Sequence, residues 1–446
     1  MLTSDNTIPS KFENILGFDV RSLAIFRIGL ASIIISDFLL RFRDIQTYYS
    51  DRGILPRTDL INNFPSPWYW SLNLLSGETL IQQLLFCFIL FFAFLLLIGY
   101  RTKLASIICW IGIVSLHNRQ PDLVFIGDDL LRTIAFWSMF LQLGAVYSFD
   151  SALNTSTKPV PKIVASGATV GLMLQLSWIY LPLNWLGALL LFIPPKNSFF
   201  KIIAIIFFIG AHFRFGLFFN TGIFTVAYLV VCLAMIPTVV WEFLHRKTYN
   251  KAIAGLTIYY DKDCGFCKKV VYLLRTFLIL PGVSLLEAQN IPSACEDMQK
   301  YNSWVIEDYR GRKCVKWHGI AYVVSISPVL WWLAPILRIK PLMAMGNKIY
   351  KAIATNRSVM GHFTNPFLFR AIVTNNSKLF QAVTCSILIL VTTANYHTAI
   401  AINSPIKGNL IERKLELVEQ FLRLDKLPVA VNLKQDSPQI PPFENK

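Results

Sequence analysis

The stretch IYYDKDCGFCKK, residues 258–269, decides how the middle of this chain folds, because it places two cysteines, Cys264 and Cys267, three residues apart. Residues 254–260 are rich in β-formers and predict a strand, whereas residues 267–280 predict an amphipathic helix that ends at a Pro-Gly pair. Cys264 is therefore expected at or just before a helix N-terminus. There, unpaired backbone N–H groups and the helix dipole stabilise a negative charge, and a thiolate is such a charge.

The spacing of the two cysteines suits thiol-disulfide exchange. Cys264 can attack a substrate disulfide as a thiolate, and Cys267 can then resolve the mixed disulfide. Lys268 and Lys269 add positive potential nearby. A strand, a CxxC motif and a helix in this order are typical of a thioredoxin-like redox module. Asp261, three residues before the first cysteine, either accepts a proton from a thiol or bonds the amides of the loop, and the sequence leaves both roles open.

Other interpretations of the motif remain open. A structural zinc site normally needs a second pair of ligands, and the other cysteines of this segment, Cys295 and Cys314, are not paired in the sequence. The motif can also be incidental, with no redox role. Asp263, next to Cys264, is a candidate helix cap, although a carboxylate there opposes formation of a thiolate.

The rest of the chain has the composition of a membrane protein. Hydrophobic residues make up 54% of the 446 residues and charged residues only 15%, whereas a soluble domain is about one-quarter charged. We predict a polytopic α-helical bundle of about seven spans before residue 245, since about 20 apolar residues cross a bilayer as a helix. An α/β thioredoxin-like domain, a further span at 379–400 and a polar tail at 401–446 follow. The candidate spans of the bundle are residues 23–40, 80–98, 104–116, 130–147, 163–192, 202–219 and 223–240.

The net charge of +16 comes largely from one part of the chain. Residues 246–378 contain nineteen Lys/Arg and seven Asp/Glu. Basic residues beside spans mark the cytoplasmic side of a membrane, where anionic headgroups attract them. The sequence therefore predicts a multi-pass cell-membrane protein whose partner is the lipid bilayer and not nucleic acid, with the cysteine pair in the cytoplasm.

The cysteine-bearing segment resembles a known family. Asp261-x-x-Cys264-x-x-Cys267, preceded by YY, looks like the signature of the DCC family of predicted thiol-disulfide oxidoreductases, and the resemblance covers residues 252–370. The order of LLEAQN, SWVIED and the apolar stretch at 319–357 is similar to that family's C-terminal half. The resemblance implies a thioredoxin-like fold in which the aspartate and the two cysteines are the catalytic residues. The segment has no clear counterpart of the proline that thioredoxins place opposite the active cysteines.

Residues 12–245 resemble the HTTM family, the membrane domains similar to vitamin K-dependent γ-carboxylase. The resemblance is carried by the order of three blocks, at residues 21–57, 117–141 and 212–237. The first block has an arginine early in a span and a tyrosine-rich loop ending in GILP. In that family a lysine in a membrane-proximal helix carries the carboxylation chemistry, and the corresponding block here, residues 175–190, contains no lysine. Carboxylase activity is therefore not expected from the resemblance.

Charged and polar residues in and beside the apolar segments outline a candidate membrane pocket. A charge in a span is costly, usually faces the bundle interior and is often functional. The alternatives are snorkelling of an arginine to the interface and an ordinary solvated loop. Such a pocket would bind a quinone or another lipid, although the sequence requires no cofactor and indicates no metal site. The candidate pocket residues are Arg27, His117, Asp128, Asp129 and His212.

Three functions fit this sequence. The first is a membrane-bound thiol-disulfide oxidoreductase acting on a protein or small-molecule thiol or disulfide, in which the bundle anchors the module or exchanges electrons with a quinone. The second is a non-catalytic membrane scaffold or peptide-processing partner with a decayed redox module, for which both cysteines are dispensable. The third is a carboxylase-like enzyme that uses a reduced quinone, with the redox module as an accessory.

Overall fold

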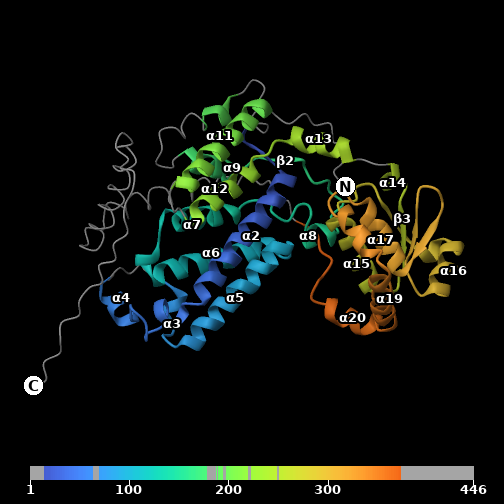
Figure 1. The fold of residues 1–446 in the computed structure, drawn as a ribbon, viewed down its shortest axis with the longest axis horizontal. Helices are drawn as coiled ribbons and strands as arrows, with labels where there is room; N and C mark the ends of the chain where they lie inside the picture. Colours follow the sequence, from blue (N-terminus) through green and yellow to red (C-terminus); the bar gives the residue numbers. More distant parts are fainter. Residues whose placement is uncertain are drawn as a thin grey trace, which may run out of the picture. The chain divides into compact units, whose positions relative to one another are not determined.

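The described residues fall in the first of the two units of the chain, Met1–Cys385. They are mostly helical, and their strands are few and short (Figure 1). The predicted span at 379–400 and the predicted tail at 401–446 lie outside the described residues. The residues that the structure describes are 15–63, 70–177, 187, 189–193, 197–218, 222–248 and 251–372.

Two helices of the described residues are long and apolar enough to cross a membrane, α2 (Val20–Phe42) and α5 (Thr79–Ile98). A third candidate is the pair α12 (Ile223–Ala234) and α13 (Thr238–Thr248), which pass the same test together but are bent by 76° at the break between them. Pro237 lies at this break and has no N–H with which to continue the hydrogen bonding of α12. The described residues thus contain two or three candidate spans, and the predicted seven are not confirmed.

Some predicted spans are shorter as helices than their apolar composition suggests. The span predicted at 130–147 is α7 (Ile126–Ser138). Its 13 residues make a helix about 20 Å long, whereas the hydrocarbon core of a bilayer is about 30 Å thick. The stretch predicted at 163–192 begins with a two-residue strand, β2 (Ile163–Val164), and continues as α9 (Gly167–Ser177). The apolar runs in the sequence therefore predicted where helices of the bundle lie, but they did not predict where each helix ends.

Helix α2 lies at the centre of the helical bundle. It packs against both α5 and α12, and α7 in turn packs against α12. Its buried side chains include Phe26, Leu30 and Ile34, which are spaced four residues apart and so share one face. A two-residue strand before it, β1 (Phe18–Asp19), pairs antiparallel with β2. The remaining helices of this part are α3 (Ile45–Tyr48), α4 (Arg57–Asn63), α6 (Thr102–Arg119), α8 (Phe149–Ala152) and α11 (Asn197–Phe218).

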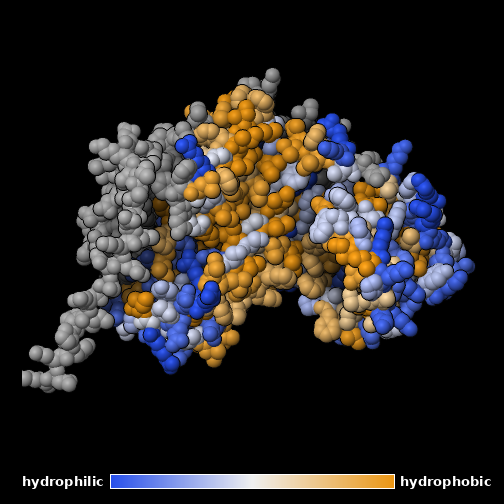
Figure 2. Space-filling model, viewed as in Figure 1, coloured by the Kyte–Doolittle hydropathy of each residue, from blue (hydrophilic) through white to orange (hydrophobic). Residues whose placement is uncertain are grey.

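One face of α5 exposes large apolar side chains, among them Phe88, Phe91 and Phe94, each about half exposed. Figure 2 shows hydrophobic residues gathered over the helices of the bundle. A broad apolar face of this kind is unfavourable in water, whereas lipid tails are as apolar as the side chains that they cover. The surface of the bundle is therefore consistent with a location in a membrane.

The cysteine-bearing part of the chain contains a four-stranded mixed sheet. Its strand order is β4 (Ser284–Glu287), β3 (Thr257–Tyr260), β5 (Val305–Glu307) and β6 (Lys313–Val315). The pair β3–β4 is parallel, and the pairs β3–β5 and β5–β6 are antiparallel. Two parallel strands need a crossover connection between them, and α15 (Gly265–Phe277) lies in that connection.

Successive side chains of β3 pack into two hydrophobic cores, one on each face of the sheet. Ile258 and Tyr260 belong to the larger hydrophobic core, together with Val271 of α15. Tyr259, between them in the strand, belongs to a second core with Met298 of α16. Successive strand residues point to opposite faces, so helices cover both faces of the sheet. The remaining helices here are α14 (Lys251–Ala254), α16 (Pro292–Tyr301), α17 (Lys316–Ile326), α18 (Ala334–Leu337), α19 (Lys340–Thr355) and α20 (Arg357–Thr364).

The predicted order of strand, cysteine motif and helix is confirmed. The strand is shorter than predicted, because residues 251–254 form α14 and only Thr257–Tyr260 pair in the sheet. The helix begins two residues earlier than predicted, at Gly265, and ends at Phe277. This earlier start brings Cys264 to the position that caps the helix.

Candidate functional site

Cys264 is the N-cap residue of α15, and Cys267 lies in the first turn of that helix. The two are joined as a disulfide, with 5.2 Å between their Cα atoms. The backbone N–H of Cys267 donates a hydrogen bond to the Sγ of Cys264 at 3.2 Å. An N-cap side chain usually accepts such a bond through oxygen, and here the acceptor is sulfur. The sulfur of Cys264 therefore occupies the place where helix amides stabilise a negative charge. Asp263, a candidate cap in the sequence, is not the cap.

The two sulfurs differ in their access to solvent. Cys264 is partly exposed, whereas Cys267 is 2% exposed and belongs to the hydrophobic core. An attacking thiol has to reach its substrate, and a resolving thiol only has to reach its neighbour. The burial therefore fits Cys264 as the attacking group. Cys314 lies against the same core, and burial raises the pKa of its thiol, which makes it a weaker nucleophile at neutral pH.

The two lysines that follow the motif have partners of their own. The Nζ of Lys269 donates to the carbonyl oxygen of Thr364 at 2.6 Å, and burial lowers the pKa of this lysine. The Nζ of Lys268 lies over the ring of Phe369, 5.7 Å from its centroid. The hydrogen bond to the Cys264 sulfur comes from the N–H of Cys267, whereas the two lysine side chains contact Thr364 and Phe369.

Asp261 connects the motif loop to two distant segments. Its Oδ1 accepts hydrogen bonds from the backbone N–H of Asp263 at 3.1 Å and from the side chain of Gln289 at 2.7 Å. Its Oδ2 lies 3.4 Å from a guanidinium nitrogen of Arg357. Of the two roles that the sequence left open, this geometry corresponds to bonding of the loop amides. Asp261 therefore acts in this structure as a positioning group for the loop that carries Cys264.

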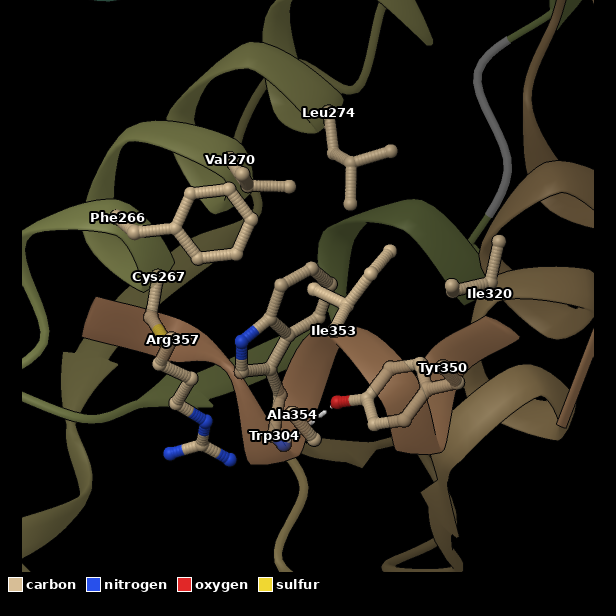
Figure 3. Close-up of a pocket in the computed structure, with 10 residues that line it drawn as sticks. All are labelled: Phe266, Cys267, Val270, Leu274, Trp304, Ile320, Tyr350, Ile353, Ala354 and Arg357. Carbon is tan, nitrogen blue, oxygen red and sulfur yellow. Dashed lines mark hydrogen bonds between the residues drawn. The ribbon is translucent and has the colours of Figure 1, made fainter. Parts of the chain in front are cut away.

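An apolar pocket lies beside the cysteine pair. Figure 3 shows Phe266, Val270 and Leu274 of α15 on one side of it, facing side chains of α19. The phenol oxygen of Tyr350 accepts hydrogen bonds from the backbone N–H of Trp304 at 3.2 Å and from a serine hydroxyl, which fixes that ring in the wall. Such a pocket can hold an apolar group next to the disulfide. The lining residues are Phe266, Cys267, Val270, Leu274, Trp304, Ile320, Tyr350, Ile353, Ala354 and Arg357.

Zinc binding by the motif finds no support among the described residues. One group of His, Cys, Asp and Glu side chains in the described ranges has its ligand atoms close enough together for a metal ion, and that group contains no cysteine. Cys295 and Cys314 remain free cysteines, each partly exposed.

Of the candidate membrane pocket residues, the structure brings His117 and Asp128 together. The Nε2 of His117 lies 3.5 Å from the Oδ1 of Asp128, and both side chains are buried. Arg41 forms ion pairs with this aspartate at 2.5 Å and with Asp37 at 2.8 Å. Asp129 is not part of the cluster, because it is partly exposed and pairs with Arg132 at 2.6 Å.

The other two candidate pocket residues have separate partners. Arg27 is fully buried and donates to the carbonyl oxygens of Leu143 and Tyr147, at 3.0 and 2.8 Å. It therefore does not snorkel to an interface. His212 is also fully buried, with its Nδ1 3.0 Å from the carbonyl oxygen of Phe208 and its ring stacked on Tyr228. Each of these residues joins segments of the bundle and is not seen to line a shared cavity.

Sequence reasoning missed the groups that complete both sites. Gln289 and Arg357 reach Asp261 from 28 and 96 residues away, and Trp304 lines the pocket from a third segment. No local spacing connects these positions. Arg41 was detectable, because it lies four residues after Asp37 on one helix, a spacing that favours an ion pair.

The chain was compared with family models, with curated proteins and with solved structures, and none of them matches. The chemistry of the described residues therefore carries the assignment of function.

Proposed function

We propose that this chain is a membrane-bound thiol-disulfide oxidoreductase with Cys264 as the attacking thiolate and Cys267 as the resolving thiol. The observation that carries the proposal is the hydrogen bond from the N–H of Cys267 to the sulfur of Cys264, at the N-terminus of α15. This bond and the dipole of the helix favour the ionised form of the sulfur over the thiol.

The reaction proceeds in two displacements. In the reduced module, the thiolate of Cys264 attacks one sulfur of a substrate disulfide, a new S–S bond forms, and the other substrate sulfur leaves as a thiolate that takes up a proton. Cys267 then loses its proton and attacks the sulfur of Cys264, which releases the second substrate thiol. The substrate gains two electrons, and the module is left with the Cys264–Cys267 disulfide. Run in reverse, the same steps oxidise a dithiol substrate.

The membrane part of the proposal is an HTTM-like bundle of about seven spans, which is the number that the apolar runs predict. The two or three candidate spans and the apolar face of α5 support a membrane location. The excess of Lys/Arg over residues 246–378 supports a cytoplasmic position for a DCC-like, thioredoxin-like module. In the reducing cytoplasm such a pair would reduce or sense disulfides, because structural disulfides are rare there.

Turnover of a disulfide substrate tests the proposed activity. The full chain, purified in detergent, should catalyse the reduction of a disulfide-bonded peptide by dithiothreitol, measured as the thiols released. A rate equal to that of dithiothreitol alone would instead favour the scaffold function, in which the redox module has decayed.

The apolar pocket predicts a preference for substrates with an apolar group beside the disulfide. Ala354→Phe places a ring in the pocket and should raise the KM for an apolar peptide disulfide about tenfold, which corresponds to roughly 1.4 kcal/mol of lost binding. The rate with glutathione disulfide should be unchanged. Ala352→Phe is the matched control, because Ala352 is an exposed residue of the same helix. Equal effects of the two variants on the apolar peptide would argue against the pocket as a binding site.

A further inference from the structure

A buried cluster of ionisable side chains joins three helices of the bundle. Asp37 and Arg41 lie on α2, His117 lies on α6, and Asp128 lies near the start of α7. The two aspartates and the histidine are 8%, 2% and 2% exposed. Buried charges are normally paired, and buried polar atoms are normally hydrogen-bonded. This cluster meets that expectation only in part.

Arg41 and one backbone amide donate hydrogen bonds to carboxylate oxygens of the cluster. The Nε of Arg41 donates to the Oδ1 of Asp37 at 2.8 Å, and a terminal guanidinium nitrogen donates to the Oδ1 of Asp128 at 2.5 Å. The N–H of Phe125 donates to the Oδ2 of Asp128 at 2.8 Å. These contacts fix both carboxylates in position, as outer partners do for carboxylates that bind a metal ion.

The other half of the cluster lacks partners. The Oδ2 of Asp37 and both ring nitrogens of His117 are buried without a hydrogen-bond partner. With a neutral imidazole, the two carboxylates and the guanidinium of Arg41 sum to one negative charge. The unsatisfied atoms are all acceptors, apart from the one ring nitrogen of a neutral histidine that carries a proton. A cation would bind the unsatisfied acceptor atoms and would offset the negative charge.

The unsatisfied atoms of Asp37 and His117, together with the carboxylate of Asp128, have a geometry that fits one ion. Asp37, His117 and Asp128 each offer a ligand atom, and these atoms all lie within 4.8 Å of one another. The Nε2 of His117 is 3.5 Å from the Oδ1 of Asp128. Two ligands bound to one tetrahedral zinc ion at 2.0–2.1 Å are separated by about 3.3 Å, so the observed separation is close to that of two ligands of a single ion.

We propose that Asp37, His117 and Asp128 bind one divalent transition-metal ion of the Zn²⁺ or Mn²⁺ class. Imidazole nitrogen favours zinc and iron over magnesium and calcium, and carboxylate oxygens are also good ligands for manganese. Three protein ligands leave a coordination position open for water or for an oxygen of a small ligand, as in catalytic rather than structural zinc sites. The proposal is independent of the cysteine pair, because neither Cys264 nor Cys267 belongs to the cluster.

Cobalt binding tests the site, because Co²⁺ replaces Zn²⁺ and absorbs visible light when it is bound to protein ligands. The full chain is purified in detergent without metal ions and with the Cys264–Cys267 disulfide kept oxidised, so that these thiols cannot bind the probe. We expect one Co²⁺ per chain, with visible absorption bands that Zn²⁺ abolishes. A chain that binds no cobalt and no zinc would overturn the proposal.

Single substitutions locate the ion. His117→Gln and Asp128→Asn should each weaken cobalt binding by at least about tenfold. Asp129→Asn is the matched control, since Asp129 is the next residue but is partly exposed and pairs with Arg132. Circular dichroism and gel filtration check that each variant is folded. If one of the two ligand variants does not fold, Asp37→Asn is measured in its place. Cobalt binding that is unaffected in the folded ligand variants, or equally weakened in the control, would place the ion elsewhere and overturn the proposal.

Discussion

Replacing Cys264 with serine should lower the rate of thiol-disulfide exchange by at least about 10³-fold, because a hydroxyl at that position cannot form the mixed disulfide. The N–H of Cys267 would still have an acceptor, since serine is itself a good N-cap residue. The fold of the module should therefore survive, and the loss can be assigned to the missing sulfur. The measurement is the rate of disulfide reduction by the full chain in detergent, with turnover compared at equal protein concentration.

Cys295→Ser is the matched control for this variant. Cys295 is a free, partly exposed cysteine of the same module, in α16, and its replacement should leave the rate within about twofold of the unmodified chain. Cys267→Ser should behave differently from both, because the mixed disulfide on Cys264 forms but is not resolved. This variant should accumulate a covalent adduct with the substrate that mass spectrometry detects. Equal activity of the Cys264 and Cys295 variants would support the scaffold function.

Arg27→Ala should destabilise the bundle by about 3 kcal/mol and lower its melting temperature by roughly 5 °C. The arginine is fully buried in α2, and its guanidinium donates to the carbonyl oxygens of Leu143 and Tyr147. Alanine leaves both carbonyls without these donors and leaves a cavity as large as the lost side chain. Thermal unfolding of the full chain in one detergent measures the effect.

Arg43→Ala provides the comparison for the buried arginine. Arg43 follows the last residue of the same helix and is exposed, so its removal should change the melting temperature by less than about 1 °C. If both variants have the same melting temperature as the unmodified chain, the hydrogen bonds of Arg27 do not stabilise the packing of α2 against the segment that follows α7.

Local sequence signals predicted the strand and the helix around the cysteine pair well, whereas contacts with distant segments determine what surrounds the pair. The strand, the motif and the helix around Cys264 form one continuous stretch, Thr257 to Phe277, so propensity and periodicity were enough. The partners of Asp261 come from segments 28 and 96 residues away, and no spacing rule reaches that far. The pocket could not be predicted for the same reason, since Trp304 and Tyr350 meet Phe266 only after the sheet has formed.

The bundle illustrates the opposite case. Apolar composition identified most of its helices, but the bend at Pro237 and the early end of α7 at Ser138 depend on the details of each chain segment. The pairing of His117 with Asp128 was anticipated only as a polar region, because the second carboxylate of the cluster, Asp37, comes from a helix 80 residues before His117 in the chain. Single-sequence periodicity places a residue on a helix face without identifying the helix that will face it.

Equilibrium redox titration of the Cys264–Cys267 pair tests the proposed function most directly. The full chain in detergent is poised at a series of potentials, and the fraction of each cysteine protected from alkylation is measured by mass spectrometry. The pair should titrate reversibly as one two-electron couple, with a midpoint between about −270 and −120 mV, the range of thioredoxin-like oxidoreductases. Two cysteines that are alkylated independently of each other, or a disulfide that the titration never reforms, would contradict the account.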